Sequence, residues 1–275
     1  MVKFLRISLL IIFFSFLAFS SLYAQTVLTN AFAHNDYKHK RPLLDALNFG
    51  VANIEADIFL YKNKLVVAHF LPYFRKNKTL ENLYLKPLQE RFALREDIYA
   101  GYGKPVILMI DIKTNASKTY LKLKEVLEKY QSILTSYDNG VVTERAVTIV
   151  ISGNKPYELM EKENVRLAFI DDDLKNMTAD STKNLCLMAS AKYSKITSWN
   201  GKKPISIIQK LKLCEFIKQA HTEGKKVRLW AIPQNTLVWK MLMDCGIDLI
   251  NSDNLEKMRT FFAKKSTAPL IAQAH

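Results

Sequence analysis

The chain has 275 residues, 49% of them hydrophobic, so it is long enough and apolar enough to bury the core of one sizeable domain. Its 40 lysine and arginine residues outnumber the 26 aspartate and glutamate residues, giving a formal net charge of +14. The basic residues are scattered and form no motif interleaved with aromatic residues, so nucleic acid is not indicated, and the charge suits acidic substrates or transient contact with an anionic membrane surface.

The N-terminal segment, residues 1–24, is typical of a secretory signal peptide. Lys3 and Arg6 precede the apolar run ISLLIIFFSFLAFS, and small residues lead to Ala24. Because this run is shorter than the roughly 20 residues that span a bilayer, we expect cleavage after Ala24 and export to a periplasm or out of the cell. An uncleaved N-terminal anchor is the alternative, and it also places the domain outside the cytosol.

Residues 25–265 are expected to form one α/β domain, followed by a frayed tail over residues 266–275 that carries no pattern. Strand-like apolar runs alternate with helix-like stretches in eight steps, with one extra strand at LVVAH, which predicts a single (β/α)8 TIM barrel. The expected strands are VLTNAFAH, VANIEADIF, KPVILMIDIK, AVTIVISG, VRLAFID, LCLMASAKYS, VRLWAIP and DLINSD. The expected helices cover 79–99 (broken by Pro87), 115–137, 155–163, 204–221, 236–245 and 255–265.

Polar side chains end three apolar runs near the front of the chain. His34 follows VLTNAFA, Glu55 and Asp57 follow VANI, and His69 follows LVVA. Strands of a barrel deliver such residues to one mouth. Glu55 and Asp57 are two residues apart, so they share one face of a strand and offer hard oxygen ligands to Mg²⁺ or Ca²⁺. The two histidines would supply a general acid and a general base.

Later strands are expected to complete this site. KPVILMIDIK ends with Asp111 and Lys113 on one face, which gives a third carboxylate for one divalent metal ion and a cation for a phosphate group. Trp230 in VRLWAIP is expected to line the substrate pocket, with core packing as the alternative. Together these residue types predict phosphate ester hydrolysis.

The spacing H-x(20)-E-x-D-x(11)-H, followed by D-I-K, resembles the glycerophosphodiester phosphodiesterase-like, or phospholipase C-like, superfamily. The sequence from His34 to Leu47, HNDYKHKRPLLDAL, is most similar to the branch that includes the altered inheritance of mitochondria protein 6 group. This resemblance implies a TIM barrel of the phospholipase C-like phosphodiesterase type. It also implies site roles, which are His34 and His69 as the acid/base pair, Glu55, Asp57 and Asp111 as metal ligands, and Lys113 on the phosphate.

Three positions depart from the superfamily pattern. Asn35 stands where arginine is usual, Phe70 where aspartate is usual, and Asp111 where the longer glutamate is usual. Asn35 remains, with Lys113 and Trp230, in the expected set of substrate- or phosphate-binding residues. The resemblance therefore indicates the reaction class better than the substrate.

The expected function is that of a metal-dependent phosphoric diester hydrolase acting on a glycerophosphodiester or a phospholipid head group. A water nucleophile would give a phosphomonoester, and a hydroxyl of the substrate would give a cyclic phosphate. One alternative is a non-catalytic secreted barrel that binds metal, phosphate or lipid, which Asn35 and Phe70 would favour. A metal-dependent glycoside or C–O hydrolase is another, and it leaves the two histidines without a role.

The three cysteines are Cys186, Cys214 and Cys245. They show neither a C-x-x-C pair nor a zinc-binding spacing, and each has apolar neighbours. We therefore expect buried small hydrophobic residues and no structural disulfide.

Overall fold

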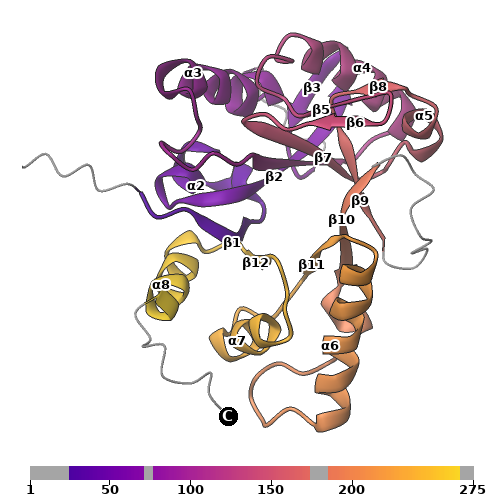
Figure 1. Cartoon of the computed structure of the whole chain (residues 1–275). Helices are drawn as coiled ribbons and strands as arrows, with labels where there is room; N and C mark the ends of the chain where they lie inside the picture. The colour runs from indigo at the N-terminus through magenta and orange to yellow at the C-terminus, as the bar shows by residue number, and fades with distance from the viewer. Residues whose placement is uncertain (1–24, 71–76, 174–184, 267–275) are drawn as a thin grey trace, which may run out of the picture.

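Eight parallel strands form a barrel with helices around it in the computed structural model (Figure 1). The structure describes residues 25–70, 77–173 and 185–266. The expected signal peptide (1–24) and the expected tail beyond residue 266 lie outside the described residues.

Neighbouring barrel strands are parallel, follow chain order, and return from the last strand to the first. A parallel bridge between Arg228 and Leu249 joins the remaining two neighbours and closes the circle. All eight expected strands are present, so the chain folds as a TIM barrel, as the sequence predicts. The strands are β1 (Leu28–Ala33), β2 (Val51–Tyr61), β4 (Val106–Ile112), β7 (Val147–Gly153), β9 (Phe169–Asp172), β10 (Cys186–Lys192), β11 (Lys226–Trp230) and β12 (Ile250–Ser252).

Two apolar layers hold the barrel together. Strands such as β2 are buried along almost their whole length, because a parallel barrel covers both strand faces. The larger layer packs the strands against the helices. A smaller cluster of strand side chains consists of Phe32, Met109, Val150, Met188 and Leu249. This smaller cluster forms the floor beneath the polar end of the barrel.

Four short strands lie outside the parallel series. β3 (Lys64–Val67) pairs antiparallel with the end of β2, which is the extra strand that the sequence predicts. β5 (Ser136–Asp138), β6 (Val141–Thr143) and β8 (Val165–Arg166) form a separate small antiparallel sheet, which the sequence analysis did not predict.

Apart from α2, which was not expected, the α-helices occupy the expected regions but differ at several ends. They are α2 (Leu44–Asn48), α3 (Lys86–Arg95), α4 (Ala116–Glu128), α5 (Tyr157–Glu161), α6 (Ile207–Thr222), α7 (Thr236–Asp244) and α8 (Leu255–Ser266), with short helical turns at Asp36–Lys38, Glu81–Leu85 and Tyr193–Lys195. The helix expected over 115–137 ends at Glu128, because the chain beyond it enters the small sheet. Pro87 does not break the helical run, but it lies where the π-helical turn Glu81–Leu85 passes into α3. α6 starts after Ser206, whose side chain accepts from the N–H of Gln209 at 3.2 Å, and not at Pro204.

The expectation of no structural disulfide is wrong, because Cys214 and Cys245 are bonded. Cys214 lies in α6 and Cys245 directly follows α7, 31 residues further along the chain. Their apolar neighbours predicted burial but could not predict that the two helices pack side by side. Within the described ranges, no helix is long and apolar enough to cross a bilayer.

Breaking this bond should destabilise the barrel by about 2–4 kcal/mol, because the unfolded chain regains the freedom that the cross-link removes. The double variant Cys214→Ser/Cys245→Ser, compared with wild type by urea denaturation, measures this loss. Alkylation in denaturant should label two more cysteines after reduction than before it. An equal number before and after reduction would contradict the bond.

Candidate active site

Carboxylates gather where the barrel strands end. The strand register pairs Asp57 with Asp111, and Asp111 with Ser152, so these three side chains form one layer at the mouth. Glu55 pairs with Met109 one layer deeper, beside the apolar floor. The two-residue spacing seen in the sequence therefore stacks Glu55 and Asp57 on the same inner face of β2.

Glu55, Asp57 and Asp111 fit a divalent metal ion. Each offers one carboxylate oxygen, and these oxygens lie within 4.8 Å of one another. Oδ1 of Asp111 is buried and accepts no hydrogen bond from the described residues. Hard oxygen ligands converging on one point, one of them otherwise unsatisfied, are what Mg²⁺ or Ca²⁺ requires.

The site is also short of positive charge. Nζ of Lys113 lies 2.8 Å from Oδ2 of Asp111 and 3.2 Å from Oδ2 of Asp57. Burial raises the pKa of Asp111, and Lys113 offsets this only in part. Burial alone would lower the pKa of Lys113, but the two carboxylates outweigh it and raise that pKa, so the ammonium stays charged. A bound cation would relieve the remaining repulsion.

His34, directly after β1, is oriented by a carboxylate. Its Nδ1 lies 2.5 Å from Oδ1 of Asp253, and its Nε2 lies 3.5 Å from Oε2 of Glu55. Nδ2 of Asn35 also lies 2.8 Å from this Nδ1, but the contact with Asp253 is shorter. Because a carboxylate only accepts, we assign the Nδ1 proton to the hydrogen bond with Asp253, which leaves Nε2 to exchange a proton. Burial alone would raise the pKa of Asp253, but His34, Asn35 and Lys38 together outweigh it and lower that pKa.

Asn35 supports the residues around it. Its backbone N–H donates to Oε2 of Glu55 at 3.1 Å, and its Nδ2 donates to Oδ2 of Asp253 at 3.3 Å. Its Oδ1 accepts from the hydroxyl of Tyr37. The residue is buried and its φ of 51° lies in the left-handed region, which asparagine tolerates better than most residues. Its polar atoms are thus bonded to the protein.

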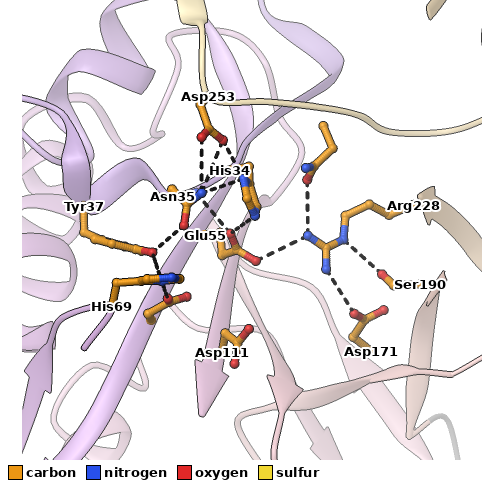
Figure 2. A network of polar contacts seen from close by, with 12 residues as sticks. His34, Asn35, Tyr37, Glu55, His69, Asp111, Asp171, Ser190, Arg228 and Asp253 are labelled. Carbon is orange, nitrogen blue, oxygen red and sulfur yellow. Dashed lines mark hydrogen bonds and ion pairs between the residues drawn. The ribbon is translucent and has the colours of Figure 1, made fainter. Parts of the chain in front are cut away.

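His69 lies on the other side of Asp57. Its Nδ1 is 2.8 Å from Oδ2 of Asp57 and 2.9 Å from the hydroxyl oxygen of Tyr37, which also lies 2.8 Å from Oδ2 of Asp57. Burial and the Asp57 carboxylate raise the pKa of Tyr37, so its hydroxyl keeps its proton. Phe70 is exposed and packs edge-on against the imidazole, with ring centroids 4.3 Å apart. Figure 2 shows Tyr37 between Asn35 and His69.

A cavity of about 860 Å³ opens beside the carboxylates. Of the expected site residues, those that line it are His34, Glu55, Asp111, Lys113 and Trp230. Asp57, His69 and Asn35 are not among the residues that line it. The indole of Trp230 is partly exposed and forms part of the cavity wall, with Nζ of Lys192 5.5 Å from the ring centroid.

Arg228 is a site residue that the sequence analysis missed. This buried guanidinium lies 3.3 Å from Oε1 of Glu55, 3.0 Å from Oγ of Ser190 and 3.6 Å from Oδ2 of Asp171. Figure 2 shows Glu55 between this group and the His34 group. The available signal was the two-residue spacing from Arg228 to Trp230 on β11, which puts both on one strand face.

Gly153 gives Asp111 its space. It ends β7 with a φ of +71°, and a Cβ at this position would lie 2.0 Å from Oδ1 of Asp111 and 2.7 Å from the carbonyl oxygen of Ile112. Neither the backbone conformation nor the contact suits a residue with a side chain. The glycine therefore fixes where the Asp111 carboxylate can lie.

Comparison with known proteins identifies one family. The model of the AIM6-like phosphodiesterase domain matches residues 20–171. Altered inheritance of mitochondria protein 6 of Eremothecium gossypii is 29% identical over 271 residues, covering 86% of this chain and 70% of that protein. Its homolog in Arthroderma benhamiae is 25% identical, covering 84% and 82%.

The barrel also resembles solved structures. A glycerophosphodiester phosphodiesterase from Parabacteroides distasonis superposes with a TM-score of 0.55 and 14% identity, covering 86% of this chain and 98% of that one. At 14% sequence identity, this structural similarity supports only the assignment of the fold.

Gly153→Ala should weaken divalent-ion binding roughly 10–100-fold, the usual effect of disturbing the groups that position a metal ligand. The added methyl group would meet Oδ1 of Asp111 and push it out of the carboxylate cluster. Calorimetric titration with Mg²⁺ and Ca²⁺ measures the change. Gly101→Ala is the matched control, because its φ is +72° but nothing lies within 4 Å of the added atom. Equal ion affinity in both variants would contradict the steric argument.

Proposed function

The chain belongs to the AIM6-like phosphodiesterase domain family, and from this membership we propose that it is a metal-dependent phosphoric diester hydrolase with two-histidine acid/base catalysis. Phosphodiester hydrolysis is the general reaction class of such a domain. One observation supports metal dependence and histidine catalysis. Glu55, Asp57 and Asp111 converge between two histidines, and the Nδ1 atom of each histidine contacts a carboxylate.

The carboxylates and the basic side chains have different roles in binding the phosphate. Glu55, Asp57 and Asp111 would hold one divalent ion, Mg²⁺ or Ca²⁺, which when bound supplies positive charge to the phosphoryl oxygens. Lys113 lines the cavity and keeps its charge, so it can bind a non-bridging oxygen. Arg228 holds Glu55 in place from the other side.

The histidines move the protons. Asp253 and Asp57 each accept from an Nδ1–H, so His34 and His69 both keep Nε2 for proton transfer. One histidine takes a proton from the attacking hydroxyl, while the other gives its proton to the leaving alcohol oxygen. Attack by water yields a phosphomonoester and an alcohol, and attack by a hydroxyl of the substrate yields a cyclic phosphate.

The cavity favours an anionic substrate with an extended alcohol part. Besides Lys113, its wall includes Lys155, Lys192 and Lys195, while Trp230 offers a flat apolar face. A glycerophosphodiester or a phospholipid head group combines a charged phosphate with such an alcohol. These features support that substrate class as part of the proposal.

Asn35 also bears on the non-catalytic alternative. It departs from the superfamily pattern, yet it contacts Glu55, Asp253 and Tyr37. Asn35 therefore positions both an expected metal ligand and the carboxylate that contacts His34. This role supports a hydrolase over a non-catalytic barrel that only binds metal, phosphate or lipid.

His34→Ala and His69→Ala should each slow hydrolysis of a phosphodiester with a poor leaving group roughly 10²–10⁴-fold, because each removes one positioned proton donor or acceptor. Glycerophosphodiesters, lysophospholipids and sphingomyelin serve as substrates, with products identified by phosphorus NMR. With p-nitrophenolate as leaving group no general acid is needed, so the variant that recovers identifies the acid. Near-normal rates in both variants on every substrate would contradict the mechanism.

Ion binding is the control for these variants. Both histidine variants should keep nearly normal affinity for the divalent ion, since the three carboxylates remain, whereas Glu55→Gln, Asp57→Asn and Asp111→Asn should each lower it. Asp248→Asn is a matched change away from the site, where Asp248 pairs with His221 at 2.8 Å. Unchanged ion binding in all three carboxylate variants would overturn the metal assignment.

Export is a further part of the proposal and rests on the basic start and apolar run of residues 1–24. Cleavage after Ala24 should leave Gln25 at the N-terminus of the exported protein. Mass spectrometry of that protein provides the test. Recovery of a form that still begins with Met1 from the membrane fraction would instead indicate an anchor.

A further inference from the structure

We propose that the first turns of α6, with the loop before them, dock on the surface of an anionic phospholipid membrane. Three large apolar side chains are exposed there, namely Ile207 (77% exposed), Ile208 (80%) and Leu211 (64%). These three residues are called the α6 patch below. Single exposed apolar residues are common, but a cluster at one end of one helix calls for a partner.

The α6 patch has no role in the core. The face of α6 that packs on the barrel carries Leu213, Ile217 and Ala220, all fully buried. With about 3.6 residues per turn, the α6 patch lies on the opposite side of the helix. α6 therefore has two apolar faces, of which only one is covered by the described chain.

The charge around the α6 patch identifies the partner. From Lys192 to Lys212 the chain contains six lysines and no aspartate or glutamate. Among the described residues, no carboxylate pairs with Lys202, Lys203 or Lys210, which flank the α6 patch. Apolar side chains surrounded by lysines match an anionic lipid surface, where the apolar groups enter the head-group region and the lysines meet lipid phosphates.

The loop before α6 is already fixed in place. Nε1 of Trp199 donates to the carbonyl oxygen of Lys203 at 2.6 Å, and Nδ2 of Asn235 donates to that of Asn200 at 3.2 Å. Asn235 also caps α7. In Figure 1 this loop and α6 (orange) form the lowest part of the coloured chain. Such a surface needs little ordering when it binds, which favours docking.

The position of the α6 patch brings lipid to the cavity. Lys212, Glu215 and Phe216, in the same part of α6, line the 860 Å³ cavity. Docking would thus place the cavity beside lipid head groups. This consequence rests on the proposed function, whereas the docking itself does not.

Sedimentation of the exported form, which begins at Gln25, with vesicles tests the proposal. The protein should bind vesicles of phosphatidylcholine mixed with phosphatidylglycerol, and bind pure phosphatidylcholine far less. Ile207→Ser/Ile208→Ser/Leu211→Ser should lower the affinity at least about tenfold by removing the inserted groups. Lys202→Gln/Lys203→Gln/Lys210→Gln should lower it roughly 100-fold, and added salt should weaken wild-type binding.

Matched variants elsewhere serve as controls. Leu94→Ser/Leu121→Ser/Val141→Ser removes three other exposed apolar groups. A second control, Lys104→Gln/Lys162→Gln/Lys226→Gln, also removes three positive charges. These lysines lie near the starts of β4 and β11 and the end of α5, at the far end of the barrel. Circular dichroism confirms that each variant is folded. Both control variants should bind vesicles as wild type does.

Three results would overturn the proposal. If the control variants lost as much vesicle affinity as the test variants, binding would be general adsorption of a basic protein and not docking of the α6 patch. Equal binding to neutral and anionic vesicles would remove the role of charge. Absence of vesicle binding, with self-association that the α6 patch variant abolishes, would assign the surface to a second copy of the chain. Failure to hydrolyse a soluble phosphodiester, with vesicle binding intact, would overturn the proposed function and leave the docking surface standing.

Discussion

The need to neutralise carboxylates buried against an apolar floor governs this structure. Glu55 and Asp57 lie almost fully out of water, where an uncompensated charge is costly. Their partners come from distant parts of the chain, and the pair Glu55–Arg228 joins residues 173 positions apart. Arg228 lies on β11 and is itself one of the two residues of the bridge that closes the barrel. Closing the barrel and satisfying the site are therefore one requirement, because the guanidinium reaches Glu55 only when the strands form a circle.

The sequence predicted the barrel well because its signals are local. Each parallel strand is an apolar run, and each run ends in a turn or a polar residue. The errors arose where contacts between distant segments override local pattern. Apolar residues continue past Glu128, as in Ile133 and Leu134, but they are buried beside the small sheet and not in a helix. The bond from Cys214 to Cys245 depends on how two helices pack, which no spacing of cysteines encodes.

The same distinction holds within the candidate site. His34, Glu55, Asp57 and Asp111 could be found because each follows an apolar run and because a two-residue period assigns a strand face. Their partners were harder to find. Asp253 was visible only as one of many polar strand ends, and its pairing with His34 crosses from the last strand to the first. The sequence thus points to the polar groups at the strand ends more readily than to the groups that contact and orient them.

The segment from His34 to Tyr37 contacts four residues of the site from three parts of the chain. It reaches Asp253 after β12, Glu55 and Asp57 on β2, and His69 after β3. Loops in most barrels vary in length among relatives, because only their ends are fixed. Here His34, Asn35 and Tyr37 are each held by hydrogen bonds to other parts of the site, so inserting or deleting one residue would displace several contacts together. We expect natural variation in length to fall on other loops of this fold and to leave this segment at constant length.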